Sequence, residues 1–581
     1  MSGMKRVWAV FGAVCVLAAG ALAQGAPGLA PVNPAFEAWQ AGKSAGGGHG
    51  YIPSPVDWSH LAPYMAGKAD PPASYNLRAL GFVTPVKSQS VCGACWSFAA
   101  CGAMEAWLKR FEGATWDFSE NHMKNTHGFD WSSCDGGNND IANAYLTRGT
   151  GPLNEVDDPY NAMAQTPPAP GAAVQKLLTR SRVFSLGTGG DRTAVQNALM
   201  EHGALSIPMT WNDAAYDDGT DTYYYSGDGL QPGDGGHMVT LVGWDDAKVV
   251  PGVAEPGAWY CKNSWSTGWG DGGYFHISYQ DTQAISEAYA FTDIAAPTAY
   301  GRIYQHDPLG MTSGFGYTGL GVIFGANVFT AAETGEIAAV GTYARVPGMQ
   351  LQITVYRGGY SNGFSNQAAT VSTTADDAGY LIVPLPTPAA FTAGQLFSVV
   401  VRYTAAGYDY PLPVEMNISG YSSAAAASAG QGYFSDSGVI YQDMHVDGYA
   451  NASVCIKAYA KSTAVTPGAV IYGTSKVESG APLTLRAVAS GTTGAVSYQW
   501  RKGASDLSGE TASTLHFDAV NDTHAGVYRV AVTDASKAVT VSDPFMVEVL
   551  APGSLSAANA AGLALMVSLM GLLGLRRVRR A

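Results

Sequence analysis

Cys95 has surroundings in this sequence that suit nucleophilic chemistry. It opens an apolar, helix-like run that continues through Trp96 and Phe98. A thiol attacks as its thiolate, and a helix N-terminus or a nearby imidazolium lowers the thiol pKa. The Gln89 side chain and the backbone N–H of Cys95 could donate hydrogen bonds to the oxyanion that such an attack creates. The sequence therefore predicts that Cys95 attacks an amide carbonyl.

Two later residues could complete such a site. His237 lies in a Gly-Gly-His-Met stretch, and Asn263 lies in a Lys-Asn-Ser-Trp stretch. An imidazole can take the thiol proton and stabilise the thiolate as an ion pair, and a third polar group can orient the imidazole. Taken one at a time, these residues also fit a core cysteine, a hydrogen-bonded histidine and a capping asparagine. Their joint occurrence favours catalysis.

The order Gln, Cys, His, Asn resembles that of the papain-like cysteine peptidases. Cys92–Trp96 fits their Cys-Gly-[Ser/Ala]-Cys-[Trp/Tyr] signature, and Thr84–Lys87 is also similar to the family. The resemblance covers roughly residues 72–293. It implies an α+β fold of a helical and a β-rich subdomain, with Cys95 and His237 on opposite walls of a cleft.

The resemblance also implies roles for neighbouring residues. Gln89 would hold the oxyanion, and Trp265 would shield the bond between His237 and Asn263 from water. Gly136 and Gly137 would leave backbone free to pair with an extended substrate. Cys134 would form a disulfide with Cys92, because Cys134–Gly137 is similar to the family's Cys-x-Gly-Gly motif. A redox pair of Cys92 with Cys95 is the alternative. Three further cysteines are predicted to be buried thiols: Cys101, Cys261 and Cys455.

Three features depart from the family pattern. Ser90 replaces the usual Gly after the glutamine, and Gly236 replaces a common Asp or Asn before the histidine. The loop 245–257 is longer than the family minimum, and it could form an edge of the cleft. None of these changes removes a catalytic group.

The composition excludes some partners. The chain has 581 residues, enough for several domains, with 47% hydrophobic and 13% charged residues. Its net charge of −14, with no basic stretch in the folded part, argues against nucleic acid as a partner. No motif points to a cofactor or a metal ion. Protein or peptide substrates remain the expected partners.

The N-terminal region reads as an export signal followed by a connecting segment. Residues 1–23 carry Lys5 and Arg6, an apolar core and a small-x-small end, which is typical of a cleaved secretory signal. An uncleaved membrane anchor is the alternative. Residues 24–71 are rich in Gly and Pro and are expected to be a prosegment or a linker, and their composition favours disorder. We place the peptidase domain at 72–295.

Two β-rich domains are expected next. In 296–462, short β-like runs alternate with turn residues, which predicts a β-sandwich. The Tyr304–Gly310 stretch resembles the lectin-like module of some microbial surface peptidases, which implies a possible glycan partner; a rigid spacer or packing partner is the alternative. In 463–550, Trp500 and the stretch around Tyr528 resemble an immunoglobulin-like domain without its two cysteines.

The C-terminal tail, 551–581, suggests contact with a membrane. Residues 555–575 carry no charge and precede four arginines within 576–580. Such a helix is long enough to cross a bilayer, and its arginines should stay in the cytoplasm. A permanent anchor, a cleaved sorting signal and a loose core helix remain open. We therefore expect an exported, surface-attached cysteine peptidase. The alternatives are an adhesin or glycan-binding protein that uses the peptidase fold as a scaffold, and a thiol enzyme that acts by transfer or exopeptidase cleavage.

Overall fold

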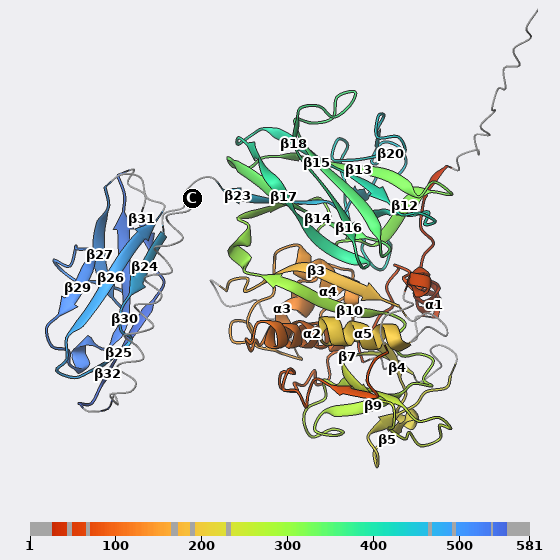
Figure 1. The fold of residues 1–581 in the computed structure, drawn as a ribbon, viewed down its shortest axis with the longest axis horizontal. Coiled ribbons are helices and arrows are strands. Elements are labelled where there is room, and N and C mark those ends of the chain that lie inside the picture. The colour runs from red at the N-terminus through yellow and green to blue at the C-terminus, as the bar shows by residue number, and fades with distance from the viewer. Residues whose placement is uncertain are drawn as a thin grey trace, which may run out of the picture. The chain divides into compact units, whose positions relative to one another are not determined.

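The computed structural model describes residues 26–42, 49–64, 70–163, 165, 172–185, 192–227, 234–462, 468–490, 495–535, 539–552 and 554. These residues form two compact units, one up to Ser462 and one from Thr463 (Figure 1). The expected signal segment 1–23 and the apolar span 555–575 lie outside the described residues. Within the described ranges, no helix combines the length and the apolar character that crossing a membrane requires.

Helix α2 is the central helix of the first unit. It spans Cys95–Phe111, in agreement with the helical run predicted from Trp96 onward. No side chain caps its first turn, and most of its residues are buried, so packing rather than capping stabilises it. Lys109 and Arg110 in the last turn are favourable to the helix dipole. The other helices are α1 (Pro34–Gly42), α3 (Glu120–Thr126), α4 (Asn139–Thr147) and α5 (Arg192–His202), with short 3₁₀ turns η1 (Ser59–Tyr64), η2 (Asp213–Ala215) and η3 (Pro297–Ala299).

One long sheet runs through the whole first unit, and thirteen strands of the described residues belong to it. Its peptidase half is antiparallel apart from one short pair, and β7 lies near its middle. The order is β11 (Arg302–Tyr304), β23 (Lys457–Ser462), β14 (Gly335–Ala344), β17 (Gly379–Phe391), β3 (Leu177–Phe184), β10 (Ala288–Ala295), β4 (Leu205–Trp211), β7 (Gly235–Asp245), β8 (Ala258–Lys262), β9 (Tyr274–Ser278), β6 (Thr222–Tyr223) and β5 (Tyr216–Asp217), with β2 (Ser74–Asn76) paired to β7.

The first β-rich region adds two more sheets. Its strands alternate buried and exposed residues, as in β15, where Leu351, Ile353 and Val355 face the core. One sheet has the order β16 (Gln367–Ala375), β15 (Met349–Arg357), β18 (Leu396–Thr404), β13 (Val322–Thr330), β20 (Gly432–Ser435) and β21 (Gln442–Asp443). The other has the order β1 (Pro27–Leu29), β12 (Ser313–Tyr317), β19 (Leu412–Met416) and β22 (Ala452–Val454).

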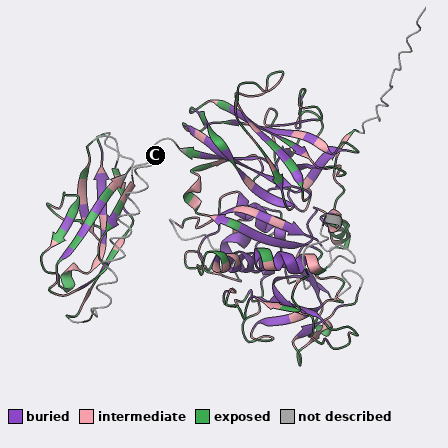
Figure 2. Cartoon of the chain, in the orientation of Figure 1, coloured by how far each residue is buried: buried purple, intermediate pink, exposed green. Residues whose placement is uncertain are grey.

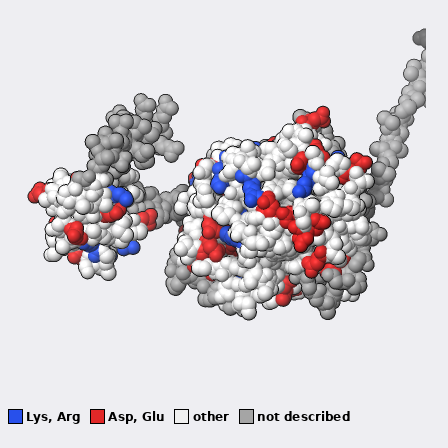
Figure 3. All heavy atoms as spheres, turned by 90° about the horizontal axis from the view of Figure 1, so that it is seen from below, with Lys and Arg blue, Asp and Glu red and all other residues white. Residues whose placement is uncertain are grey.

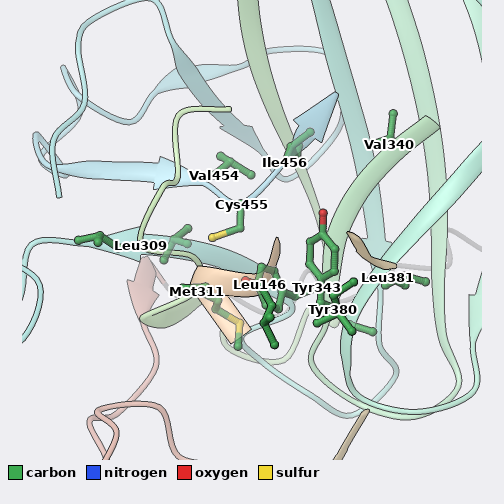
Figure 4. Packing of buried hydrophobic residues seen from close by; sticks show 14 of the residues in the cluster. Leu146, Leu309, Met311, Val340, Tyr343, Tyr380, Leu381, Val454, Cys455 and Ile456 are labelled. Carbon is green, nitrogen blue, oxygen red and sulfur yellow. The ribbon is translucent and has the colours of Figure 1, made fainter. Parts of the chain in front are cut away.

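The helical and β-rich parts of the first unit share a core. Strand β17 pairs with β3 at Leu381 and Arg180, so the long sheet passes from one part into the other. Figure 4 shows Leu146 of α4 packed among residues of the β-rich part, including Tyr343, Tyr380 and Cys455. Figure 2 shows that the strands and helices on both sides of this junction are mostly buried. The β-rich part is therefore a packing partner of the helices.

The N-terminal segment is attached to the β-rich part. Strand β1 pairs antiparallel with β12, and the Gln40 side chain donates to the Ser419 carbonyl at 2.8 Å. Phe36 of α1 packs edge-on against Tyr421, with ring centroids 5.5 Å apart. This segment is thus fixed before the chain reaches residue 49.

The second unit consists of two small sheets around Trp500. Trp500 is fully buried, and its indole N–H donates to the Ala512 carbonyl at 2.9 Å. The Tyr528 hydroxyl donates to the His524 carbonyl at 2.8 Å, next to the 3₁₀ turn η4 (Asp522–His524). These contacts fit the immunoglobulin-like hypothesis, which stays a prediction. The strands are β24 (Gly468–Tyr472), β26 (Leu483–Ser490) and β29 (Thr514–Phe517) in one sheet, and β25 (Lys476–Glu478), β32 (Phe545–Leu550), β30 (Gly526–Thr533), β27 (Ser497–Lys502), β28 (Ser505–Asp506) and β31 (Val539–Val541) in the other.

Most of the surface drawn in Figure 3 is uncharged. Figure 3 shows one face on which acidic and basic side chains are scattered among uncharged ones. Among the described residues drawn there, no continuous basic patch is visible. This distribution agrees with the composition, in which charged residues are few and acidic ones predominate.

Candidate active site

Helix α2 places Cys95 at its first position. Cys95 is a fully buried free thiol, and it hydrogen-bonds the backbone of Met238, the residue after His237. The start of α2 and strand β7 therefore meet at this point. Burial raises the pKa of the Cys95 thiol to about 12, although hydrogen bonds with the backbone of Met238 and Trp96 lower it. The sequence led us to expect a low thiol pKa, but the pKa is raised here because the thiol is fully buried.

His237 is held by an asparagine. Its Nε2 lies 2.8 Å from the Asn263 Oδ1, and Asn263 follows strand β8 directly. Burial lowers the pKa of His237 to about 3, the nearby His49 lowers it further, and the bond with Asn263 raises it. The imidazole is therefore neutral here. Its Nδ1 has no hydrogen-bond partner among the described residues, so one ring nitrogen is available for other chemistry.

Aromatic rings enclose the histidine. The Trp265 ring stacks on His237, with centroids 4.7 Å apart and planes 23° apart. Trp211 meets both rings edge-on. This position of Trp265 is the one that the family resemblance implied for a shield over the His237–Asn263 bond.

Gln89 is held by hydrogen bonds to Ser264, Cys92 and His49. Its Oε1 accepts from the Ser264 hydroxyl at 2.7 Å, which leaves its Nε2 to donate. That Nε2 donates to the Cys92 carbonyl at 2.9 Å and to the His49 carbonyl at 2.8 Å. Ser90, where the family has Gly, adopts a left-handed φ of 52°. A residue with a side chain is strained there, which explains why Gly is usual.

Residues 49–52 of the chain itself lie in this site. Gly137 donates its N–H to the Gly50 carbonyl and accepts from the Ile52 N–H, both at 2.9 Å, and the Tyr51 N–H donates to the Gly236 carbonyl at 3.1 Å. Tyr51 thereby pairs with Gly137 in the parallel sense. Gly137, predicted to pair with a substrate, pairs with the N-terminal segment.

His49 belongs to the same segment and touches the aromatic cluster. Its ring centroid lies 4.8 Å from that of Trp265 and 5.4 Å from that of His237. Burial lowers the pKa of His49, and the charge of Asp213 partly offsets this. His49 is therefore favoured in its neutral form while the segment is bound.

Glycines allow the close packing at this site. A Cβ on Gly137 would lie 2.6 Å from the Trp96 ring, and a Cβ on Gly50 would lie 2.3 Å from the Gly93 backbone. Gly136 has a φ of 134°, which favours glycine, and its missing side chain makes room for Ile52. Larger residues at these positions would push the segments apart.

The cysteines are paired as the resemblance implied. Cys92 and Cys134 form a disulfide, with their Cα atoms 4.7 Å apart. Cys95 takes no part in it, so the redox-pair alternative is wrong for this structure. Cys101, Cys261 and Cys455 are free and buried, as predicted.

Sequence reasoning missed two parts of this site. The first is the role of His49–Ile52 in the cleft, since the Gly-rich stretch before it predicted disorder. The second is a buried ion pair behind the site, where the Lys87 Nζ lies 2.8 Å from Glu120 and 3.8 Å from Glu105. The lysine was noted only as part of a family motif, and the spacing of the acids gave no signal.

Comparison with known proteins identifies both parts of the first unit. Residues 71–292 match the family described as papain family cysteine protease, and residues 303–460 match the lectin-like domain family. This chain carries a papain-family peptidase domain followed by a lectin-like domain. The peptidase domain is 32% identical over 218 residues to a cathepsin L-like peptidase of Aedes aegypti and 28% identical over 217 residues to human cathepsin L2. The chain covers 59% and 61% of those two proteins, and 36% of its own length takes part in each match.

The paired architecture has a solved counterpart. It is the crystal structure of the cysteine protease and lectin-like domains of Cwp84, a surface layer associated protein of Clostridium difficile. The TM-score is 0.63 at 23% identity, over 75% of this chain and 98% of that one. A second structure, of Cwp84 after propeptide cleavage, gives a TM-score of 0.59 at 24% identity, over 67% of this chain and 99% of that one. At these identities the likeness shows that the peptidase and lectin-like domains share the Cwp84 fold.

Proposed function

We propose that this protein is an exported, surface-attached cysteine peptidase that hydrolyses peptide bonds through Cys95, His237 and Asn263, with Gln89 as an oxyanion donor. The observation that carries the proposal is the 2.8 Å contact from His237 to Asn263, beside a free thiol at the first position of α2. An imidazole oriented by one partner and open at its other nitrogen suits proton transfer.

The proposed reaction has two stages. His237 takes the Cys95 proton, the thiolate attacks the scissile carbonyl, and His237 then protonates the leaving amine, which leaves a thioester. His237 then takes a proton from a water molecule, whose oxygen attacks the thioester. The C–S bond breaks, the acid product leaves, and His237 returns the proton to the Cys95 sulfur. Gln89 Nε2 and the Cys95 N–H stabilise the oxyanion in both stages. Asn263 keeps the imidazole oriented, and Trp265 keeps water from their bond.

We infer further that the described conformation is latent. Gln89 Nε2 already donates a hydrogen bond to the His49 carbonyl, and the backbone of Gly137 is already paired with Gly50 and Ile52. A substrate needs both groups, so residues 49–52 must leave before it can bind. In this proposal residues 24–71 act as a prosegment. Their departure also restores water around Cys95 and His237, which removes the main cause of their shifted pKa values.

The test is covalent labelling of the purified protein with an epoxide that alkylates papain-like thiols. We expect labelling of Cys95 after limited proteolysis within residues 24–71, together with new peptidase activity. Cys95→Ala should show neither. Peptidase activity that persists in Cys95→Ala, with serine and metal peptidases inhibited, would contradict the proposal.

Surface attachment belongs to the same proposal. The tail 551–581 would reach the membrane, the lectin-like domain would contact surface glycan, and the related Cwp84 is a surface layer associated protein. Deletion of residues 555–581 should release the enzyme into the medium, where limited proteolysis within residues 24–71 should activate it. An adhesin that uses the peptidase fold as a scaffold is the second candidate. It predicts surface binding without any labelling of Cys95.

A further inference from the structure

The lectin-like domain has a polar hollow on the outer face of one sheet. The hollow has a volume of about 330 Å³ and is lined by residues of strands β16, β15 and β18. Figure 1 shows these three strands side by side. This volume is at the small end of the range for ligand sites, roughly 300–1,000 Å³. Apart from the buried Leu351, it is lined by polar residues of these three strands: Gln350, Gln352, Ser372, Thr373, Thr374, Arg402 and Thr404.

Strand register brings these side chains into two rows. Gln352 lies opposite Ser372 on one side and Arg402 on the other. Gln350 lies opposite Thr374 and Thr404 in the same way. Successive side chains of a strand point to opposite faces, and the alternate residues Leu351 and Ile353 are buried. The two rows therefore face away from the core.

These side chains keep their hydrogen-bonding groups unused in the fold. Among the described residues, neither glutamine nor Ser372, Thr374 or Thr404 has a side-chain hydrogen bond, and Arg402 has no ion pair. In the next row of the same face, by contrast, the hydroxyls of Thr354 and Thr370 lie 3.2 Å apart and bond each other. Amides, hydroxyls and a guanidinium that share one hollow are free for an external partner.

Arg402 gives this hollow its charge. Its guanidinium lies over the Phe324 ring, 5.8 Å from the centroid, and Gly438 packs closely against the same ring. No Asp or Glu lines the hollow. A guanidinium held by a ring, without a carboxylate partner, matches an anionic group and can bind a carboxylate through two parallel hydrogen bonds.

Aromatic side chains continue the same face beyond the polar rows. Tyr356 lies one row past Thr354 on β15, and its ring packs near Phe364, which contacts Tyr360. All three are only half-buried. Such rings offer an apolar surface next to the polar hollow, which suits a ligand with both hydroxyl groups and C–H faces.

We propose that this hollow binds an acidic polysaccharide, with a sugar carboxylate on Arg402 and sugar hydroxyls on Gln350, Gln352 and the neighbouring hydroxyls. This inference deepens the proposed contact with surface glycan and is independent of the peptidase chemistry. A protein partner fits less well, because stable protein interfaces have an apolar centre and this hollow is lined almost wholly by polar groups. A neutral glycan would leave the guanidinium unpaired.

The test is affinity electrophoresis of the full-length protein in gels that contain polygalacturonate, alginate or hyaluronan, with dextran and galactan as neutral counterparts. We expect retardation by at least one acidic polymer and by neither neutral one. Arg402→Ala should weaken binding by about 10- to 100-fold, the range for a hydrogen bond to a charged group. Gln352→Ala should weaken it less.

The matched control is Arg357→Ala, which removes the same charge from an exposed position of β15 that does not line the hollow. If Arg402→Ala is retarded as strongly as the unchanged protein, or if Arg357→Ala loses as much retardation as Arg402→Ala, the polymer binds elsewhere and the proposed site is wrong. Equal retardation by neutral polymers would overturn the acidic specificity. Failure of all three acidic polymers to retard the protein would overturn the proposal, whereas epoxide labelling of Cys95 would still test the peptidase separately.

Discussion

Replacement of Gly50 by valine should open the cleft. Gly50 has a φ of 114°, and a Cβ there would lie 2.3 Å from the backbone of Gly93. A left-handed conformation costs an ordinary residue roughly 1–2 kcal/mol, and overpacking costs roughly 1–3 kcal/mol more. We therefore expect Gly50→Val to weaken closure by about 3 kcal/mol, or roughly 100-fold.

That cost is comparable with what holds the segment in place. Five hydrogen bonds fix residues 49–52: from Gln89 Nε2 to His49, between Gly137 and both Gly50 and Ile52, from Tyr51 to Gly236, and from the Asn138 side-chain amide to the Ile52 carbonyl. At about 1 kcal/mol each, they contribute roughly 5 kcal/mol. Valine should thus remove most of the stability of the closed form.

The assay is the rate at which the epoxide labels Cys95, measured without proteolysis. We expect the rate to rise by up to roughly 100-fold in Gly50→Val. Gly42→Val is the matched control, because no atom lies within 4 Å of a Cβ built on Gly42. If Gly50→Val and Gly42→Val both label at the wild-type rate, the N-terminal segment does not control access to the thiol, and the reasoning is refuted.

Three other perturbations have distinct expected outcomes. After activation, His237→Ala should reduce kcat nearly as much as loss of the nucleophile, whereas Asn263→Ala should cost about 10- to 1,000-fold, as measured by steady-state kinetics. Acidification below about pH 6.5, the unperturbed His pKa, should speed labelling of Cys95 in the uncleaved protein. Burial lowers the pKa of His49 in the closed form, so the open form binds a proton more tightly. The closed form therefore loses stability relative to the open form as the pH falls. The labelling rate of the uncleaved protein is divided by that of the activated enzyme at each pH. If this ratio does not change with pH, His49 does not have this role. Burial raises the pKa of Glu120 to about 8, so the test of its ion pair is run above that pH. There, Lys87→Met should lower the free energy of unfolding by about 3–5 kcal/mol in chemical denaturation, because it leaves the buried carboxylate without this cation; a change below about 1 kcal/mol would mean that Glu120 takes up a proton instead.

The sequence was informative where chemistry depends on local residue types. The positions of Cys95, His237, Asn263 and Gln89 could be named because each lies in a short stretch with its own pattern. The structure brings all four into one region, and their catalytic roles remain a proposal. The Cys92–Cys134 disulfide and the β-strands after residue 296 could also be predicted, because each follows from a local sequence pattern.

The rest depends on contacts between distant residues. The segment His49–Ile52 is held mainly through its backbone, and backbone hydrogen bonds carry no side-chain signature. The junction of the long sheet rests on the pairings of Leu381 with Arg180 and of Ala378 with Val183. Neither stretch of sequence carries a signal for the other. The raised pKa of Cys95 follows from its complete burial in the folded chain, so it could not be predicted from the motif alone.

The shared sheet of the peptidase and lectin-like domains has a thermodynamic consequence. Because β17 pairs with β3 and a single core spans both domains, we expect neither domain to unfold without the other. A ligand that binds only the folded form stabilises everything that unfolds with its site, by about 2.7 kcal/mol at a hundred times its Kd. Occupation of the hollow by a polysaccharide would then protect the peptidase domain against heat and proteolysis through mass action alone. Attachment to a surface would in this way prolong the lifetime of the enzyme that acts there.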